Sequence, residues 1–293
     1  MLLALNMTFS IMKLRIGSFI ALAALAGIMT GGGGIGWLEG AVFALGVLGA
    51  SGAAGAFNQY HERERDRLMA RTHNRPFANG TLKAGPIWPA TFALLLAGSL
   101  MMAWSVGGTL ATVLVFLGAV TYGVVYTVWL KARSVWNIVI GGAAGSFAVL
   151  AGAAAAAPEQ GPALGPVPVL LAGVLFLWTP PHFWSLAVTR CEDYRRAGIP
   201  MLPVVSEPDV WAPVIFCHVA ALLALSFLPL AFGMGWIYGA FAALGGLPFL
   251  LAAWRLLRAP GRQAAMRTFR ASLVQFALLA TGVILDGAAR WAA

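Results

Sequence analysis

The sequence changes character where residues 40–57, GAVFALGVLGASGAAGAF, are followed by residues 58–76, NQYHERERDRLMARTHNRP. The first segment is apolar, and the second is the only stretch of the chain where acidic and basic residues are densely mixed. This transition predicts a membrane helix that ends at the water interface. Asn58, Glu62 and Asp66 are spaced i, i+4, i+8, so a helix would place all three on one face.

The composition extends this interpretation to the whole chain. Hydrophobic residues make up 60% of the 293 residues and charged residues 10%, with a mean hydropathy of +0.83. Soluble globular proteins carry about 25% charged residues. We therefore predict an all-α polytopic membrane protein, in which residues 1–293 form a single transmembrane domain with a core of about 13–288. About nine transmembrane helices would form one bundle around an intramembrane cavity, at about 15–32, 37–58, 87–106, 108–130, 137–157, 166–188, 210–230, 234–254 and 268–288.

The basic residues are distributed unevenly. When the loops between these spans are assigned alternately to two sides, 18 of the 19 Lys and Arg residues fall on one side, and only Arg290 falls on the other. Because basic residues concentrate in cytoplasmic loops, this pattern predicts a cytoplasmic N-terminus and a C-terminus on the opposite side. The net charge of +9 thus reflects orientation in a lipid bilayer, and we expect no nucleic-acid partner. Cys191 and Cys217 have neither disulfide nor zinc spacing.

The charged segment carries the groups that a magnesium–diphosphate substrate requires. Mg²⁺ prefers oxygen ligands, and guanidinium groups pair with phosphates. We predict Asn58, Glu62 and Asp66 as metal ligands. The first and last are about 12 Å apart along a helix, so either two ions bridge the diphosphate or one end acts through water. Three basic residues would neutralise the leaving diphosphate: Arg71, Arg75 and Lys83. The simpler alternative is an orientation loop whose acidic residues pair with neighbouring arginines.

A second polar segment runs from the end of the fourth predicted span to the start of the fifth. Tyr126, Lys131, Arg133 and Asn137 lie there within a few residues of one another. Two snorkelling cations beside glycines that permit close helix packing would explain much of this segment. Asn137 fits that explanation poorly, because a polar side chain that opens a membrane span needs a partner.

A third segment begins inside the sixth predicted span. Pro180 and Pro181 are expected to break or kink that helix, which would put His182 near the membrane surface. On a helix His182 shares one face with Arg190 and Asp193, so it could face the charged segments. The alternative is a packed, hydrogen-bonded membrane histidine.

Together the three segments resemble the intramembrane aromatic prenyltransferase superfamily of the UbiA type, and within it the protohaem IX farnesyltransferases, or haem O synthases. The matching stretches are Asn58-x3-Glu62-x3-Asp66-x2-Met69-x-Arg71-Thr72-x2-Arg75-Pro76, Tyr126-Thr127 with Lys131 and Asn137-Ile-Val-Ile-Gly-Gly142, Trp178-Thr-Pro-Pro-His182-Phe-Trp184, and Asp193-Tyr194-x2-Ala-Gly-Ile-Pro-Met-Leu-Pro203. The last span, Phe269-x2-Ser272 through Asp286, also resembles the family's C-terminus. The similarity runs in order from about Lys13 to Asp286. Two features depart from the family pattern. Glu62 and Glu64 stand where many members have aspartates, and Arg190 and Tyr194 occupy the aspartate positions of the wider superfamily's second acidic motif.

The resemblance implies a specific reaction. A farnesyl group would pass from farnesyl diphosphate to a vinyl group of haem B, with addition of water, to give haem O and diphosphate for haem–copper oxidase biogenesis. Mg²⁺ would be the cofactor, haem a substrate, and a haem A synthase or oxidase assembly proteins further partners. The site would face the cytoplasm from a bacterial inner membrane. We assign catalytic roles to Asn58, Glu62, Asp66, Lys131, His182 and Asp193, and substrate binding to Arg71, Arg75, Lys83, Tyr126, Arg133, Asn137, Arg190 and Tyr194.

Two other functions remain open from the sequence. The nearer is prenylation of a quinone precursor or chlorin, which the altered second motif disfavours. The more distant is a transporter or an assembly factor, for which internal repeats or ionisable residues in mid-membrane would be expected.

Overall fold

The computed structural model describes residues 2–31, 34–157 and 164–292. Within these ranges the regular structure is entirely helical. The elements in order are α1 (Leu2–Ile11), α2 (Leu14–Ile28), α3 (Trp37–His61), α4 (Arg63–Arg67), α5 (Ile87–Val120), the π-helix η1 (Thr121–Leu130), α6 (Asn137–Gly141), α7 (Ala143–Ala156), α8 (Pro166–Thr189), α9 (Cys191–Arg196), α10 (Leu202–Val205), α11 (Pro208–Phe227), the 3₁₀-helix η2 (Leu228–Phe232), α12 (Trp236–Arg258) and α13 (Arg262–Ala292).

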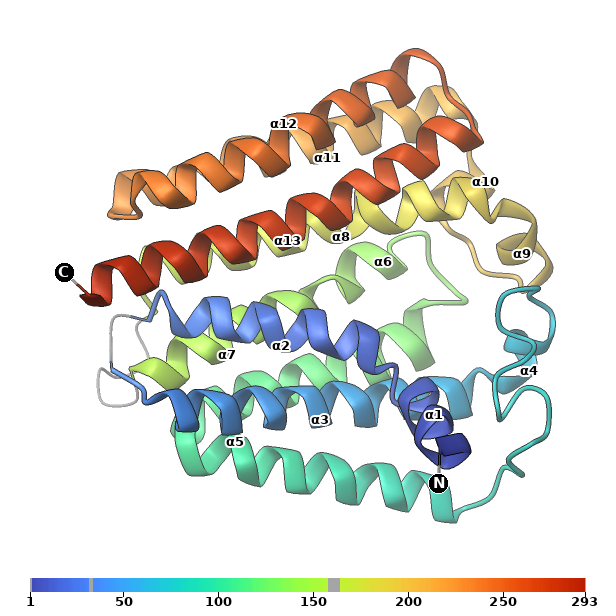
Figure 1. The fold of residues 1–293 in the computed structure, drawn as a ribbon. Coiled ribbons are helices and arrows are strands. Elements are labelled where there is room, and N and C mark those ends of the chain that lie inside the picture. Colours follow the sequence, from blue (N-terminus) through green and yellow to red (C-terminus); the bar gives the residue numbers. More distant parts are fainter. Residues whose placement is uncertain (1, 32–33, 158–163, 293) are drawn as a thin grey trace.

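The predicted spans correspond to these helices. In the described part of the chain, seven helices are long and apolar enough to cross a membrane, and α2 is a shorter apolar helix of 15 residues. One of the seven covers Ile87–Leu130, where the sequence predicts two spans. Gly108 interrupts it with φ 68° and ψ −166°, and Figure 1 shows α5 turning back on itself. Nine crossings therefore stay a prediction, while the positions of the helical segments agree with it.

Small residues allow the helices of the first half to pack closely. A Cβ atom on Gly152 of α7 would lie 1.9 Å from the Ala24 carbonyl oxygen of α2, and one on Gly27 would lie 2.1 Å from the Val149 carbonyl oxygen. Two backbones that approach this closely exclude any side chain between them, which is the usual way in which membrane helices associate.

The polar segments gather at one end of the bundle. Figure 1 shows α4 and α9 next to each other at this end, whereas α13 finishes at the opposite end. Pro180 and Pro181 lie inside α8, which continues unbroken to Thr189, so the expected break does not occur. As a result His182 stays within the helix, buried between α8 and α13.

Candidate active site

The predicted metal ligands lie where α3 meets α4. The α-helix ends at His61, but the backbone N–H of Glu62 still donates to the Asn58 carbonyl oxygen at 2.9 Å, and that of Asp66 donates to the Glu62 carbonyl oxygen at 2.8 Å. These bonds keep the three residues on one side of the chain. All three side chains are buried, with at most 1% of each residue exposed.

Two lysines lie against these ligands. Lys131 forms an ion pair with Glu62 Oε2, and both side chains are buried. The Lys13 ammonium donates to Asn58 Oδ1 and, at 2.9 Å, to the hydroxyl of Tyr122. The other end of the Asn58 amide donates to Glu62 Oε2 at 2.9 Å. The site therefore holds one carboxylate and two ammonium groups within a single hydrogen-bonded network.

The π-helix η1 brings its polar side chains to this network. Thr127 Oγ1 accepts from Asn58 Nδ2 at 2.9 Å and donates to the carbonyl oxygen of Tyr122, five residues earlier, at 2.8 Å. The backbone N–H of Lys131 bonds in the same i−5 pattern to Tyr126, whose ring lies 5.6 Å from the Lys131 ammonium. π-Helical turns are rare and are often found at functional sites.

The electrostatics of the pair favour ionised Glu62. Burial raises the pKa of its carboxyl, but the charge and hydrogen bond of Lys131, the charge of Lys13 and the hydrogen bond from Asn58 outweigh this, so the pKa is lowered. Burial lowers the pKa of Lys13 well below its usual value, and Arg75 and Lys131 lower it further, against an opposing effect of Glu62 and Asp66.

The donor set fits a magnesium ion that also binds a phosphate. Glu62 Oε1 is a buried oxygen with no hydrogen-bond partner among the described residues, and Asn58 contributes an amide oxygen. Asp66 receives both its hydrogen bonds from Arg75 Nη1, at 2.9 and 2.7 Å. The described residues contain no group of three or more His, Cys, Asp or Glu poised to hold a metal. Because Mg²⁺ takes one or two carboxylates and fills its other positions with water and phosphate oxygens, Glu62, Asp66 and the Asn58 oxygen could hold it together with a bound phosphate.

The third segment docks onto the first. Asp193 Oδ1 accepts the backbone N–H of Ala70 at 3.2 Å and a hydrogen bond from Arg196 at 2.6 Å. Burial raises the pKa of Asp193, but these two hydrogen bonds and the arginine charge lower it overall. Arg71 reaches Tyr194, with its guanidinium 5.7 Å from the centre of that ring. One apolar cluster contains residues of all three segments: Met69, Ile138, Trp184, Tyr194, Ile199 and Met201.

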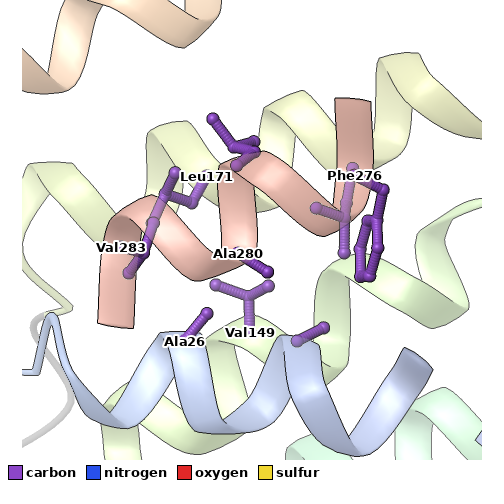
Figure 2. Close-up of a pocket in the computed structure, with 9 residues that line it drawn as sticks. Ala26, Val149, Leu171, Phe276, Ala280 and Val283 are labelled. Atoms are coloured by element: carbon purple, nitrogen blue, oxygen red, sulfur yellow. The ribbon is translucent and has the colours of Figure 1, made fainter. Parts of the chain in front are cut away.

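His182 lies in an aromatic cluster between α8 and α13. Its ring stacks on Trp178 at 4.2 Å between centroids and lies 4.7 Å from the ring of Phe269. Trp178 in turn contacts Phe276, at 5.5 Å. Phe276 also lines an apolar pocket between α2, α7, α8 and α13, which Figure 2 shows with Ala26, Val149, Leu171, Ala280 and Val283 around it. Thus the aromatic cluster borders an apolar space inside the bundle.

Not every predicted site residue joins these contacts. Arg133 is exposed and donates to the carbonyl oxygens of Val128 and Trp129, so it caps a helix end. Lys83 and Arg190 are exposed, and neither is part of the lysine network. Asn137 is buried and donates to the Ser134 carbonyl oxygen at 2.6 Å, while its Oδ1 has no partner among the described residues.

Four residues near the site were given no site role from the sequence: Lys13, Tyr122, Thr127 and Ser272. Lys13 had been counted only as an orientation residue, and Thr127 and Ser272 only as parts of matching stretches. Lys13 has φ 51°, the one positive value among the described residues other than glycine. A basic residue just before an apolar span gives no signal that would separate an orientation role from a site role.

Asn58, Glu62, Asp66, Lys131 and Asp193 are buried at one end of the helical bundle, beside an apolar interior, and this arrangement suits a substrate that is both charged and apolar. The chain belongs to the UbiA prenyltransferase family, whose model matches residues 19–278. It is therefore an integral membrane prenyltransferase.

Relatives and solved structures agree with this assignment. The chain is 50% identical over 283 residues to "Protoheme IX farnesyltransferase 2" of Paramagnetospirillum magneticum, covering 96% of this chain and 97% of that protein. A structure of digeranylgeranylglyceryl phosphate synthase matches with a TM-score of 0.78 at 17% identity, over 97% of this chain and 98% of the other. A UbiA homologue from Archaeoglobus fulgidus, solved with DMAPP and Mg²⁺, matches with a TM-score of 0.70 at 16% identity, over 94% and 99%. At these identities the two structures establish the shared fold.

Proposed function

We propose that this protein transfers the farnesyl group of farnesyl diphosphate to a vinyl group of haem B, with addition of water, and so produces haem O and diphosphate. The observation that carries the proposal is the meeting of the three segments at one end of the bundle. There the Glu62–Lys131 pair, the Asp193–Ala70 contact and one shared apolar cluster join residues that are far apart in sequence. The name of the relative that is 50% identical supports the choice of both substrates.

Binding of the diphosphate follows from the charges of the site. Lys13, Lys131, Arg71 and Arg75 supply positive charge for the phosphate oxygens, because guanidinium and ammonium groups are their usual partners. Asn58, Glu62 and, with Arg75 released from it, Asp66 would hold Mg²⁺, which would neutralise part of the charge that develops on the leaving diphosphate. When the diphosphate arrives, the lysine ammonium groups can exchange the Asn58 and Glu62 oxygens for phosphate oxygens. They stabilise the leaving group in that position.

The reaction needs a dry site for its carbon chemistry. The C1–O bond of farnesyl diphosphate breaks and its electron pair leaves with the diphosphate. The π-electrons of the vinyl group form the new bond to C1, and a water oxygen then bonds to the vinyl carbon nearer the macrocycle and releases a proton. The apolar residues around Phe276 suit contact with a prenyl chain, although the cavity of about 20 Å³ there would have to widen to admit one, and exclusion of water protects the cationic carbon until the vinyl group reacts.

His182 and the residues Asp193–Tyr194 belong to the acceptor side in this proposal. The aromatic cluster around His182 offers flat apolar surfaces for a macrocycle, and apolar side chains continue from it into the bundle through Phe276. The site faces the cytoplasm of a bacterial inner membrane, where a soluble diphosphate and the basic loops meet.

Separate binding measurements test this division of the site. We expect His182→Ala to weaken binding of haem B while the affinity for farnesyl diphosphate with Mg²⁺ stays within about twofold of wild type. Glu62→Gln should weaken binding of farnesyl diphosphate with Mg²⁺ and leave the affinity for haem B within about twofold of wild type. Equal losses of both affinities in either variant would contradict the two-sided site, and failure of the wild-type protein to convert haem B in the presence of both other components would contradict the function itself.

A further inference from the structure

Ser272 of α13 connects two neighbouring turns of α8. Its backbone oxygen accepts a hydrogen bond from Trp178 Nε1 at 2.9 Å, and its hydroxyl oxygen lies 2.7 Å from His182 Nδ1. The residue is 0% exposed. One serine therefore holds both aromatic rings that stack on each other in the acceptor half of the site.

The direction of the bond between Ser272 and His182 can be assigned. The Ser272 hydroxyl donates to the Phe269 carbonyl oxygen at 2.6 Å. A serine hydroxyl has a single hydrogen but two acceptor lone pairs. If that hydrogen pointed to His182 instead, two oxygen atoms would face each other at 2.6 Å with no hydrogen between them, which is repulsive. His182 Nδ1 is therefore assigned as the protonated nitrogen, and its N–H donates a hydrogen bond to the Ser272 hydroxyl oxygen.

We propose that Ser272 is a positioning residue, which fixes His182 in the Nδ1–H form and presents its Nε2 lone pair to the iron of the haem substrate. This inference rests on the proposed function, in which His182 belongs to the acceptor side. Nε2 has no hydrogen-bond partner among the described residues, and the ring retains 8% exposure. Trp178 stacks on the ring, Phe269 lies against it and Ser272 occupies its Nδ1 edge, so the edge that carries Nε2 is left for a ligand.

The chemistry of haem iron fits this arrangement. A neutral imidazole nitrogen is a common iron ligand, and ligating histidines almost always donate their other N–H to a fixed acceptor. Loss of such an acceptor usually weakens metal binding by about 10–100-fold, because the ring can then rotate or exchange tautomers. Ser272 touches neither the vinyl group nor the diphosphate in this proposal and acts only through His182.

The test uses full-length protein in detergent, titrated with ferric haem B and followed by its absorption spectrum. We expect Ser272→Ala to bind haem about 10–100-fold more weakly and to shift the haem spectrum toward that of His182→Ala. Affinity for farnesyl diphosphate with Mg²⁺ should stay as in wild type. Ser272→Cys keeps a weak acceptor of similar size, so its haem affinity should lie between those of wild type and Ser272→Ala. It also provides a second variant if the alanine variant folds poorly.

Ser226 of α11 offers a matched control. It is also a buried helical serine, its hydroxyl bonds the Leu222 carbonyl oxygen at 2.8 Å, and its backbone oxygen accepts from the Tyr238 hydroxyl at 2.6 Å. No histidine in the described part of the chain bonds to it. Ser226→Ala should therefore leave the haem spectrum and affinity unchanged.

A double-variant comparison decides whether Ser272 acts through His182. In a His182→Ala background, Ser272→Ala should have no further effect on haem affinity, since contacts in one network are not additive. The inference fails if Ser272→Ala keeps the wild-type spectrum and affinity while the wild-type enzyme makes haem O. It also fails if its effect persists without His182. Absence of haem binding and haem O production in the wild type would instead overturn the proposed function.

Discussion

Replacing Lys131 with methionine should expose how strongly the site depends on its buried ion pair. The Lys131 and Glu62 side chains are 9% and 1% exposed. Methionine retains much of the lysine volume but leaves the Glu62 carboxylate with only the 2.9 Å hydrogen bond from Asn58 and the nearby charge of Lys13. Glu62 Oε1 already lacks a partner among the described residues, so the site has little means to compensate.

The expected cost can be bounded in two ways. Leaving one charge of a buried pair uncompensated costs about 3–5 kcal/mol. The carboxylate can avoid part of this cost by taking up a proton. At pH 7 that step costs at most about 4 kcal/mol, which is about 2.7 pH units from the ordinary glutamate pKa of about 4.3, at about 1.4 kcal/mol per unit. We therefore expect Lys131→Met to lose up to about 4 kcal/mol of unfolding free energy at pH 7.

The pH dependence gives the sharper signature. In the wild type the pKa of Glu62 is lower in the folded state than in the unfolded state. The contribution of Glu62 to the unfolding free energy is therefore complete above the unfolded pKa of about 4.3, and it is lost as pH falls through the folded pKa. Without Lys131, burial dominates and raises the folded pKa. The variant should then lose stability as pH rises from about 4.3 toward neutrality, which is a slope of the opposite sign.

Thermal unfolding of detergent-purified protein between pH 5 and pH 8 measures both effects, because the Glu62 contribution is constant over this range in the wild type and should fall with rising pH in the variant. Arg267→Gln removes one exposed positive charge from α13 and serves as the control, with no expected change in slope. The double variant Glu62→Gln/Lys131→Met should recover most of the stability but no turnover, because both charges are gone together. Wild-type stability and slope in Lys131→Met, or additive losses in the double variant, would refute the reasoning.

Three further outcomes follow from other contacts. Asp66→Asn removes the charge that faces Arg75 and, like Glu62→Gln, should lower turnover by about 100-fold or more in a folded protein; normal activity in both would count against the metal and diphosphate assignment. Asp193→Ala removes the acceptor of the Ala70 N–H, so hydrogen exchange should accelerate around residues 68–75, and unchanged protection would show that this bond does not dock the loop. Gly152→Ala should destabilise the protein by about 1–3 kcal/mol or more, because the new Cβ would lie 1.9 Å from the Ala24 carbonyl oxygen. Gly98→Ala, with nothing within 4 Å of the new Cβ, should be neutral or slightly stabilising in the same melting assay.

The parts of the fold that depend on local sequence could be predicted. Apolar runs long enough to span a membrane gave the helix positions, and the charged ends of those runs gave the segments that meet at one end. The spacing of Asn58, Glu62 and Asp66 placed three buried polar residues on one side of the chain, where the i→i−4 backbone bonds keep them. Their roles in metal binding stay a prediction.

The parts that depend on distant pairing could not be predicted. Lys13 meets Asn58 across 45 residues and Ser272 meets His182 across 90, and neither partner carries a local sign of the other. The π-helix η1 was also missed, since its residues have no pattern that differs from an ordinary apolar helix. The double proline at 180–181 indicated a break or a kink in the helix, and the break does not occur. α8 continues through it because surrounding helices bury this part of the chain, where tertiary packing outweighs the local tendency to break.

The most direct test of the central claim measures farnesyl transfer and water addition in the same haem product. Purified protein would be incubated with haem B, farnesyl diphosphate and Mg²⁺ in ¹⁸O-labelled water, and the extracted pigment analysed by mass spectrometry. We expect the wild type to yield haem that has gained one farnesyl group and one ¹⁸O-labelled hydroxyl, and Glu62→Gln to yield unmodified haem B. Unmodified haem from the wild type, a farnesylated product without ¹⁸O, or full conversion by Glu62→Gln would contradict the account.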